Sequence, residues 1–289
     1  MKFWQAITWM EPEQMLAVAA HAEQVGFDGL MLSDHGVYPR DIRSRYPYSA
    51  DGSPPQAPDG FVPDCWASIG ALAAATRTIR LAVGVYVLPL RNVFEVARAT
   101  GTLAILSSGR LVLGAGLGWM KEEFDVYGVD FATRAARCDE MIGVLRRLWT
   151  GGMVEHHGTH FDFPPLQIAP APPAAVPVYI GGNSSAALRR AARLGDGWIS
   201  AGNAPEAVPG ILAELTRLRR EAGRDALPFE TVVGLGTSLD VAELQRFGAL
   251  GMGVGLSYPF RYLLGERSSV DQKKRYLDRF AEDVIRHCR

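Results

Sequence analysis

The stretch AEQVGFDGLML, residues 22–32, passes from a helical pattern through a glycine and a short turn into an apolar run. Helical spacing is seen at Met15, Leu16, Ala19, Ala22 and Val25. Gly26 stands where a left-handed residue ends a helix. The same sequence of helix, glycine, turn and strand returns in AARLGDGWIS, residues 191–200, and in FGALGMGVGLSY, residues 247–258. These joints predict that helices alternate with buried strands.

Further apolar runs and periodic segments extend this alternation over the chain. Strands are expected at 2–8, 79–88, 110–117, 176–181 and 230–235, and helices at 66–76, 93–106, 134–149, 184–194, 206–222, 240–250 and 271–288. Roughly eight strands and eight helices indicate a parallel sheet with right-handed crossovers, and a (β/α)8 barrel formed by one domain, residues 1–289, explains the count most simply. A doubly wound open sheet is the alternative, because strand order cannot be read from the sequence.

Two irregular stretches interrupt the alternation. Residues 37–63, rich in Pro, Tyr, Asp and Gly, follow the second strand, and residues 151–175 precede the fifth. We interpret both as insertions. A long loop after a barrel strand lies on the catalytic face, so residues 37–63 are a candidate lid, with surface decoration as the alternative.

Composition excludes several classes of protein. Of the 289 residues 48% are hydrophobic and 21% charged, which argues against disorder, and a net charge of −1 predicts neither a nucleic-acid nor a membrane-surface partner. No apolar stretch is long enough to span a bilayer, and the N-terminus does not look like a signal peptide. The cysteines, Cys65, Cys138 and Cys288, are odd in number and widely spaced, which favours a reducing, cytoplasmic compartment.

Asp34 and His35 are the candidate catalytic residues. They follow the apolar run 29–32, so they are expected at the C-terminal end of the second strand, where barrel enzymes place their chemistry. An imidazole can take or give a proton near neutral pH, and a carboxylate can orient it. Neighbouring strand residues point to opposite faces, so Asp34 need not touch His35. An Asp that caps backbone amides beside a surface His is the alternative.

Two glycine-rich segments are candidate ligand sites. Gly114, Gly116 and Trp119 end the fourth strand in GAGLGW, a spacing that does not fit a dinucleotide fingerprint; the glycines either let a flat ligand approach or relieve crowding. Gly181, Gly182, Asn183, Ser184 and Ser185 join the fifth strand to a helix. Converging amides and a helix N-terminus there suit an anion such as phosphate, and an ordinary helix cap is the alternative.

His156, His157 and His160 have a spacing that resembles metal ligation. The surrounding VEHHGTHFDF alternates and turns at Gly158 and Thr159, which predicts a small hairpin. We expect no metal, because no cluster of carboxylates or thiolates accompanies these histidines.

Long blocks of this chain resemble the luciferase-like monooxygenase superfamily, in particular its branch of oxidoreductases that use coenzyme F420, a 5-deazaflavin. The resemblance is carried by residues 22–35, 47–52, 76–92, 106–141, 145–151 and 176–198. It implies a (β/α)8 barrel with the coenzyme ring at the C-terminal mouth and its phosphate over the loops of the fifth and sixth strands. Dimerisation as a homodimer is implied as well, with helices 66–76 and 93–106 as candidate contacts.

The resemblance assigns the coenzyme pocket residue by residue. The ring site corresponds to Asp34, His35, Gly84, Val85, Gly114, Gly116 and Trp119, and the phosphate site to Gly181, Gly182, Asn183, Ser184 and Ser185, with Ser200 in addition. A non-prolyl cis peptide bond is expected at or next to Gly84–Val85. The sugar-phosphate dehydrogenases of this superfamily have an acidic residue where this chain has Trp119, and the nearest acids are Glu122 and Glu123, which disfavours that substrate class.

The resemblance implies hydride transfer between F420 and a small organic substrate, with His35 handling the proton and Asp34 setting the polarity of the pocket. One alternative is a monooxygenase that uses reduced FMN from a separate reductase. Another is a flavin-binding barrel without catalysis, which would need neither Asp34-His35 nor a lid.

Overall fold

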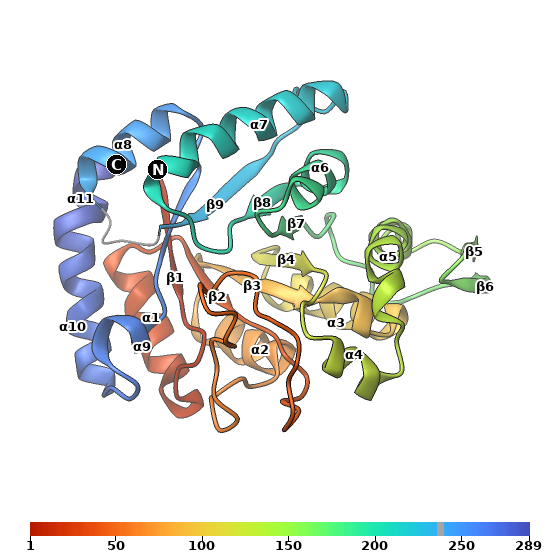
Figure 1. The fold of residues 1–289 in the computed structure, drawn as a ribbon, viewed down its shortest axis with the longest axis horizontal. Coiled ribbons are helices and arrows are strands. Elements are labelled where there is room, and N and C mark those ends of the chain that lie inside the picture. Colours follow the sequence, from red (N-terminus) through yellow and green to blue (C-terminus); the bar gives the residue numbers. More distant parts are fainter. Residues whose placement is uncertain (236–239) are drawn as a thin grey trace.

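A closed barrel of parallel strands organises the computed structural model, which describes residues 1–235 and 240–289 (Figure 1). The strands follow one another around the barrel in the order β1-β10-β9-β8-β7-β4-β3-β2. Their bounds are β1 (Lys2–Ala6), β2 (Gly29–Leu32), β3 (Arg80–Val87), β4 (Leu111–Gly116), β7 (Val178–Gly181), β8 (Gly197–Ile199), β9 (Glu230–Gly234) and β10 (Val254–Ser257). The expected (β/α)8 architecture is confirmed, and the open sheet is excluded because β1 pairs with both β2 and β10.

Helices surround the barrel. They are α1 (Met15–Val25), α2 (Cys65–Ala75), α3 (Val93–Leu106), α4 (Lys121–Tyr127), α5 (Arg134–Leu148), α6 (Ser185–Leu194), α7 (Val208–Glu221), α8 (Val241–Ala249), α9 (Phe260–Leu264), α10 (Val270–Phe280) and α11 (Arg286–Cys288). The helix expected at 271–288 is α10 and α11 joined by a π-helical turn at Ala281–Ile285. The buried face continues through that turn, so sequence periodicity alone could not separate the three parts.

The two expected insertions are present. The segment between β2 and α2 contains no regular element. The second insertion forms the predicted antiparallel hairpin of β5 (Val154–His157) and β6 (Asp162–Leu166), which extends away from the barrel beyond α5 (Figure 1).

The glycines that follow helices α1, α6 and α8 are favoured for different physical reasons. Gly26 and Gly251 adopt φ of +102° and +101°, the left-handed conformation that favours glycine. Gly195 has φ of −81°, and a side chain there would place its Cβ 2.7 Å from the Gly197 carbonyl oxygen. Close approach of the backbone, rather than a left-handed turn, explains that glycine.

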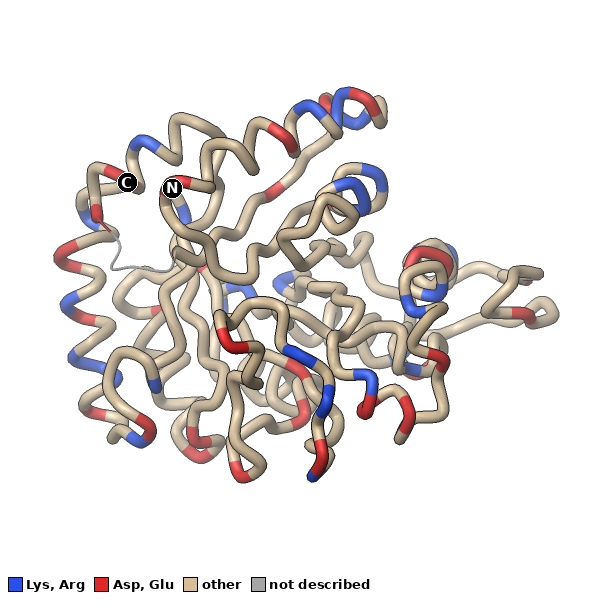
Figure 2. Tube along the Cα trace, viewed as in Figure 1, with Lys and Arg blue, Asp and Glu red and all other residues tan. Residues whose placement is uncertain are grey.

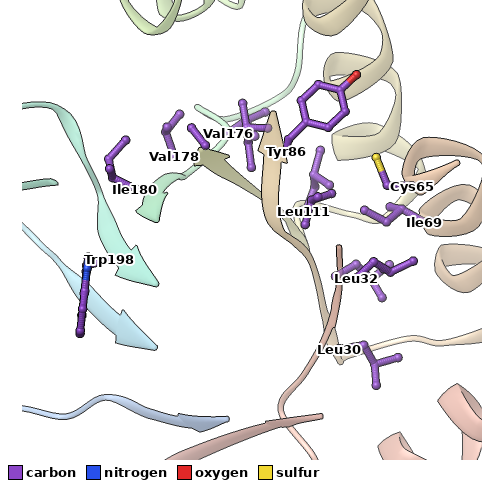
Figure 3. Packing of buried hydrophobic residues seen from close by; sticks show 14 of the residues in the cluster. Leu30, Leu32, Cys65, Ile69, Tyr86, Leu111, Val176, Val178, Ile180 and Trp198 are labelled. Carbon is purple, nitrogen blue, oxygen red and sulfur yellow. The ribbon is translucent and has the colours of Figure 1, made fainter. Parts of the chain in front are cut away.

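Strand residues alternate between two apolar clusters. Leu30 and Leu32 of β2 face outward, and Figure 3 shows them beside Cys65 and Ile69 of α2. Met31 belongs instead to the cluster inside the barrel. That interior cluster comprises Trp4, Ala6, Met31, Ala82, Val112, Tyr179, Ile199, Val232, Val254 and Leu256. A filled interior gives a rigid base for the loops at the C-terminal ends of the strands.

Charged residues of both signs lie along α10, which contains Asp271, Lys273, Lys274, Arg275, Asp278 and Arg279 (Figure 2). Within residues 1–235 and 240–289, no helix has the length and hydropathy that crossing a bilayer requires.

Candidate active site

His35 lies at the C-terminal mouth of the barrel, three residues beyond the end of β2. Its Nδ1 is 3.0 Å from Oε2 of Glu123 in α4. Glu123 is fully buried, and its Oε1 accepts a hydrogen bond of 2.6 Å from the Gly36 N–H. Because that carboxylate accepts at both oxygens, Nδ1 of His35 donates, and Nε2 is left able to accept a proton.

Asp34 lies beside His35 but has different partners. Its carboxylate accepts two bonds from Nη2 of Arg91, at 2.8 and 2.7 Å, and one of 3.0 Å from the Val87 N–H. Burial raises the pKa of Asp34, and the charge of Arg91 opposes that rise. The Asp34 carboxylate therefore holds the end of β3 through Val87 and the side chain of Arg91. Asp34 is thus placed to position the residues around the pocket.

Arg91 is held by more than this ion pair. Its guanidinium lies 4.7 Å from the centroid of the Tyr86 ring and 5.5 Å from that of Tyr127. Burial lowers the pKa of Arg91, but the interactions with Asp34 and Tyr86 outweigh burial and raise that pKa overall. The guanidinium of Arg91 is therefore protonated at every ordinary pH.

The strand β3 is irregular where the ring site was expected. The peptide bond Gly84–Val85 is cis, in agreement with the expectation, and the pairing of β3 with β4 shifts register between Val83 and Tyr86. A Cβ on Gly84 would lie 2.2 Å from Sδ of Met31. A side chain at this position would therefore require the Met31 thioether to move.

The glycines of the neighbouring strands make room for this bulge. A Cβ on Gly114 would lie 2.0 Å from the Val83 carbonyl oxygen. On Gly116 and Gly181 it would lie 2.2 and 2.3 Å from the methyl groups of Val85. The side chain of Val85 occupies the space between β4 and β7 that side chains at Gly116 and Gly181 would need. Relief of crowding thus explains why these positions are glycine.

Trp119 packs close to His35, as the edge-to-face contact of their rings shows (6.1 Å between centroids). Tyr46 of the insertion also packs edge-to-face with Trp119, with 5.2 Å between centroids. The insertion therefore reaches the mouth, which supports the interpretation as a lid.

The corner between β7 and α6 is fixed by the neighbouring loop. Gly182 has φ of +113°, and its carbonyl accepts a bond of 2.8 Å from the indole N–H of Trp198. The amide of Asn183 donates to the Gly202 carbonyl and accepts from the Ala201 N–H, both at 3.1 Å. Asn183 is thus a brace that sets the shape of the corner.

The serines of this corner face solvent. Ser184 caps α6 by accepting from the Ala187 N–H at 3.2 Å, and Ser185 is the first helical residue; both are exposed. The first-turn N–H groups of a helix have no acceptor within it, so this exposed turn can receive an anion. The Tyr48 hydroxyl of the insertion lies 3.2 Å from the position of a Cβ on Gly182.

Ser200, the additional phosphate candidate, is buried at the end of β8. Its Oγ accepts a bond of 2.8 Å from the Gly234 N–H. The structure gives it a role in joining β8 to β9, while its hydroxyl proton is left for a further bond.

Sequence reasoning missed Glu123 and Arg91 as partners of the two predicted residues. Glu123 lies in the first turn of α4 between the buried Met120 and Phe124. These three positions share one helix face, so an acid within an apolar stripe was the signal that could have identified it.

The hairpin histidines are engaged individually. His156 lies 3.1 Å from a carboxylate oxygen of Glu140, and His157 lies 2.6 Å from one of Asp162. Over residues 1–235 and 240–289, no group of three or more His, Cys, Asp or Glu side chains is arranged to hold a metal ion.

Comparison with known proteins adds a family match and relatives. A family model described as luciferase-like monooxygenase matches residues 4–245. An uncharacterized protein of Mycobacterium tuberculosis is 37% identical over 93% of this chain and 94% of its own length. A protein named F420-dependent glucose-6-phosphate dehydrogenase, from Amycolatopsis mediterranei, is 33% identical over 65% of this chain and 53% of its own length.

Solved structures share the fold at low identity. A monooxygenase, RslO1 from Streptomyces bottropensis, has a TM-score of 0.77 and 19% identity over 99% of each chain. An F420-dependent secondary alcohol dehydrogenase, in complex with an F420-acetone adduct, has a TM-score of 0.76 and 20% identity over the full length of both chains. At such identities the likeness establishes the fold alone.

Proposed function

Because the chain belongs to the luciferase-like monooxygenase family, we propose that it is an oxidoreductase that transfers a hydride between coenzyme F420 and a small organic substrate. The observation that carries the proposal is the His35–Glu123 pair at the barrel mouth, which leaves Nε2 of His35 as a proton acceptor. The name of the Amycolatopsis mediterranei relative supports the choice of F420.

The residues present fit such a coenzyme. Ser184 and Ser185 of this turn are exposed and Gly182 and Asn183 are half-buried, while Ala187 Cβ and the Tyr48 hydroxyl both lie 3.2 Å from the Cβ position of Gly182. The backbone amides of the turn suit a phosphate. The bulge at Gly84–Val85 places backbone at the mouth, where a flat ring would rest. When bound, the deazaflavin supplies a carbon centre that accepts or donates a hydride.

The protein supplies the proton chemistry. In oxidation, Nε2 of His35 takes the proton of the substrate hydroxyl as the carbon–hydrogen bond gives up its hydride; in reduction, the same atom returns a proton to the carbonyl oxygen. Glu123 holds Nδ1 protonated in both directions and stabilises the imidazolium. Trp119 and Tyr46 limit access of water to the imidazole.

A titration of the purified protein with F420 and, separately, with FMN tests the coenzyme assignment. We expect F420 to bind at least tenfold more tightly than FMN, and the loaded protein to exchange hydride with an alcohol or carbonyl compound. Tight FMN binding without F420 binding would instead support the reduced-FMN monooxygenase. Coenzyme binding without any turnover would support a barrel that only binds flavin.

A charge at the corner tests the phosphate site. Ser185→Asp places an acid at the first position of α6, where it favours the helix, yet it repels a phosphate there. We expect F420 affinity to fall about tenfold or more with an unchanged melting temperature. Ala207→Asp, at the exposed start of the neighbouring helix α7, is the matched control and should leave the affinity within a few-fold. Equal effects of both variants would contradict a phosphate site at 182–185.

A further inference from the structure

Aromatic side chains from separate loops meet at the mouth of the barrel. We refer to them as the mouth cluster, which consists of two groups in ring contact, one of Tyr46, Tyr48 and Trp119 and the other of Trp9, Tyr258 and Tyr262. The two groups adjoin where Tyr262 lies near enough to Tyr46 to raise its pKa. Trp9 follows β1, Tyr46 and Tyr48 belong to the insertion after β2, Trp119 follows β4, and the last two residues follow β10. The cluster thus combines side chains from the segments that follow four different strands, β1, β2, β4 and β10.

The cluster continues directly from His35. Trp119 contacts His35 and Tyr46, and Tyr46 contacts Tyr48 with 5.4 Å between centroids. Burial, together with neighbouring Tyr48 and Tyr262, raises the pKa of Tyr46 to about 12. The phenol of Tyr46 is therefore uncharged at neutral pH.

Two features of the cluster indicate that it binds a ligand. Trp9 adopts φ of 57°, a strained conformation for a residue with a side chain, and such residues gather at binding sites. The indole N–H groups of Trp9 and Trp119 are buried, and neither has a hydrogen-bond partner in the described part of the chain. Buried donors in native proteins are nearly always paired, so a ligand acceptor would satisfy them.

The charge around the cluster is balanced. The guanidinium of Arg261 lies 5.1 Å from the Trp9 ring centroid and 5.6 Å from that of Tyr262. It donates to Glu266 at 2.7 Å and to the Pro55 carbonyl at 3.1 Å. A cationic ligand would be repelled by Arg261, and an anionic ligand would meet a guanidinium already paired with a carboxylate.

We propose that the mouth cluster selects a planar, uncharged substrate, an aromatic or conjugated alcohol or ketone, and that Trp119 and Tyr46 pack against its ring while its oxygen meets His35. Aromatic rings offer such a ligand edge-to-face and offset contacts beyond simple apolar burial. The inference deepens the proposed function and rests on it, because it names the substrate class of that same site. A phosphorylated sugar does not fit this arrangement.

Three matched probes test the proposal on the protein saturated with F420. Acetophenone is planar and uncharged, cyclohexyl methyl ketone has the same oxygen on a non-planar ring, and glucose 6-phosphate is polar and anionic. Saturation-transfer NMR gives their dissociation constants without any turnover. We expect acetophenone to bind at least fivefold more tightly than cyclohexyl methyl ketone, and glucose 6-phosphate not to displace it.

Variants then locate the effect. Tyr46→Leu and Trp119→Leu should each weaken acetophenone binding by about 2- to 10-fold and leave the binding of cyclohexyl methyl ketone nearly unchanged. Phe229→Leu is the control, because this aromatic ring, which packs against Arg219, precedes β9 at the opposite end of the barrel. It should leave all three constants unchanged.

The outcomes separate this inference from the proposed function. If F420 binds but the two ketones bind equally, or if glucose 6-phosphate displaces acetophenone, the substrate class is wrong and the coenzyme assignment stands. If F420 does not bind at all, the proposed function fails first. The comparison of the wild-type protein with the three probes decides the question even where a Leu variant does not fold.

Discussion

Glu123→Gln changes one atom of the side chain but reverses one of its two hydrogen bonds. The Gly36 N–H is a fixed donor, so the amide oxygen of the new Gln must accept there. Its NH2 group then faces Nδ1 of His35, which must become the acceptor. The proton of the neutral imidazole moves to Nε2, and the atom that faces the substrate can no longer take a proton.

The size of the effect follows from this loss. Removal of a positioned general base costs about 10²- to 10⁴-fold in rate, so we expect kcat for alcohol oxidation to fall by that factor at neutral pH. Loss of a charge-assisted buried bond should lower the free energy of unfolding by about 1.5–3 kcal/mol. F420 affinity should change by no more than a few-fold.

Single-turnover kinetics of the coenzyme absorbance measure the rate, and the nitrogen NMR shifts of the His35 imidazole report its tautomer directly. Asp125→Asn is the control, because this exposed carboxylate of the same helix pairs with Lys121 on the helix surface. Wild-type turnover in Glu123→Gln, or a lower rate with an unchanged His35 tautomer, would refute the reasoning.

Four further predictions concern the framework of the protein and its assembly. Arg91→Ala leaves Asp34 buried without its cation and should lower the free energy of unfolding in urea by about 3–5 kcal/mol. Since the pKa of the Asp34 carboxyl is already raised, this loss of stability should shrink as the pH falls and the carboxylate is protonated. A loss of stability that does not change with pH would contradict the ion pair. Burial raises the pKa of Glu23, but hydrogen bonds from backbone N–H groups of the segment after α2 outweigh burial and lower that pKa from 4.5 to about 2. The lowered pKa contributes about 1–2 kcal/mol to the free energy of unfolding above pH 4.5, after discounting for solvent. This contribution is lost as the pH falls from 4.5 toward 2, so Glu23→Gln should destabilise the protein at pH 7 but not near pH 2. Gly116→Ala should cost about 1–3 kcal/mol and weaken F420 binding, and adding Val85→Ala should restore stability. Sedimentation should show a homodimer, and a concentration-independent monomer would exclude it.

The alternation of strands and helices was predictable, because a buried parallel strand between two helices leaves a strong local pattern, whereas the order of the strands was not. The joints at Gly26 and Gly251 were read with their correct conformation, since a left-handed residue after a helix selects glycine. Short elements such as α4 and α9 were missed, because seven and five residues carry too little periodicity. Helix boundaries elsewhere were close to those expected.

The candidate site was only partly predictable, for a different reason. The place of His35 follows from its strand, which is local information. Its partner Glu123 is 88 positions away in the chain, and the partner of Asp34 is 57 positions away. Contacts of that range depend on how loops of different strands meet. Likewise, the glycines of β4 could be read either as a ligand cradle or as relief of crowding, and only the positions of Val83 and Val85 decide between them.

The pairing of β1 with β10 has a consequence for biosynthesis. Lys2 lies opposite Val254, so β1 must wait for about 250 further residues to be synthesised before its second neighbour exists. At roughly 5–20 residues per second, about 250 residues take roughly 12–50 s on the ribosome. During that time the nascent sheet has an unpaired edge on each side, and unpaired edges invite aggregation. We expect productive folding in the cell to depend on chaperones that shield those edges until translation has delivered the closing strand.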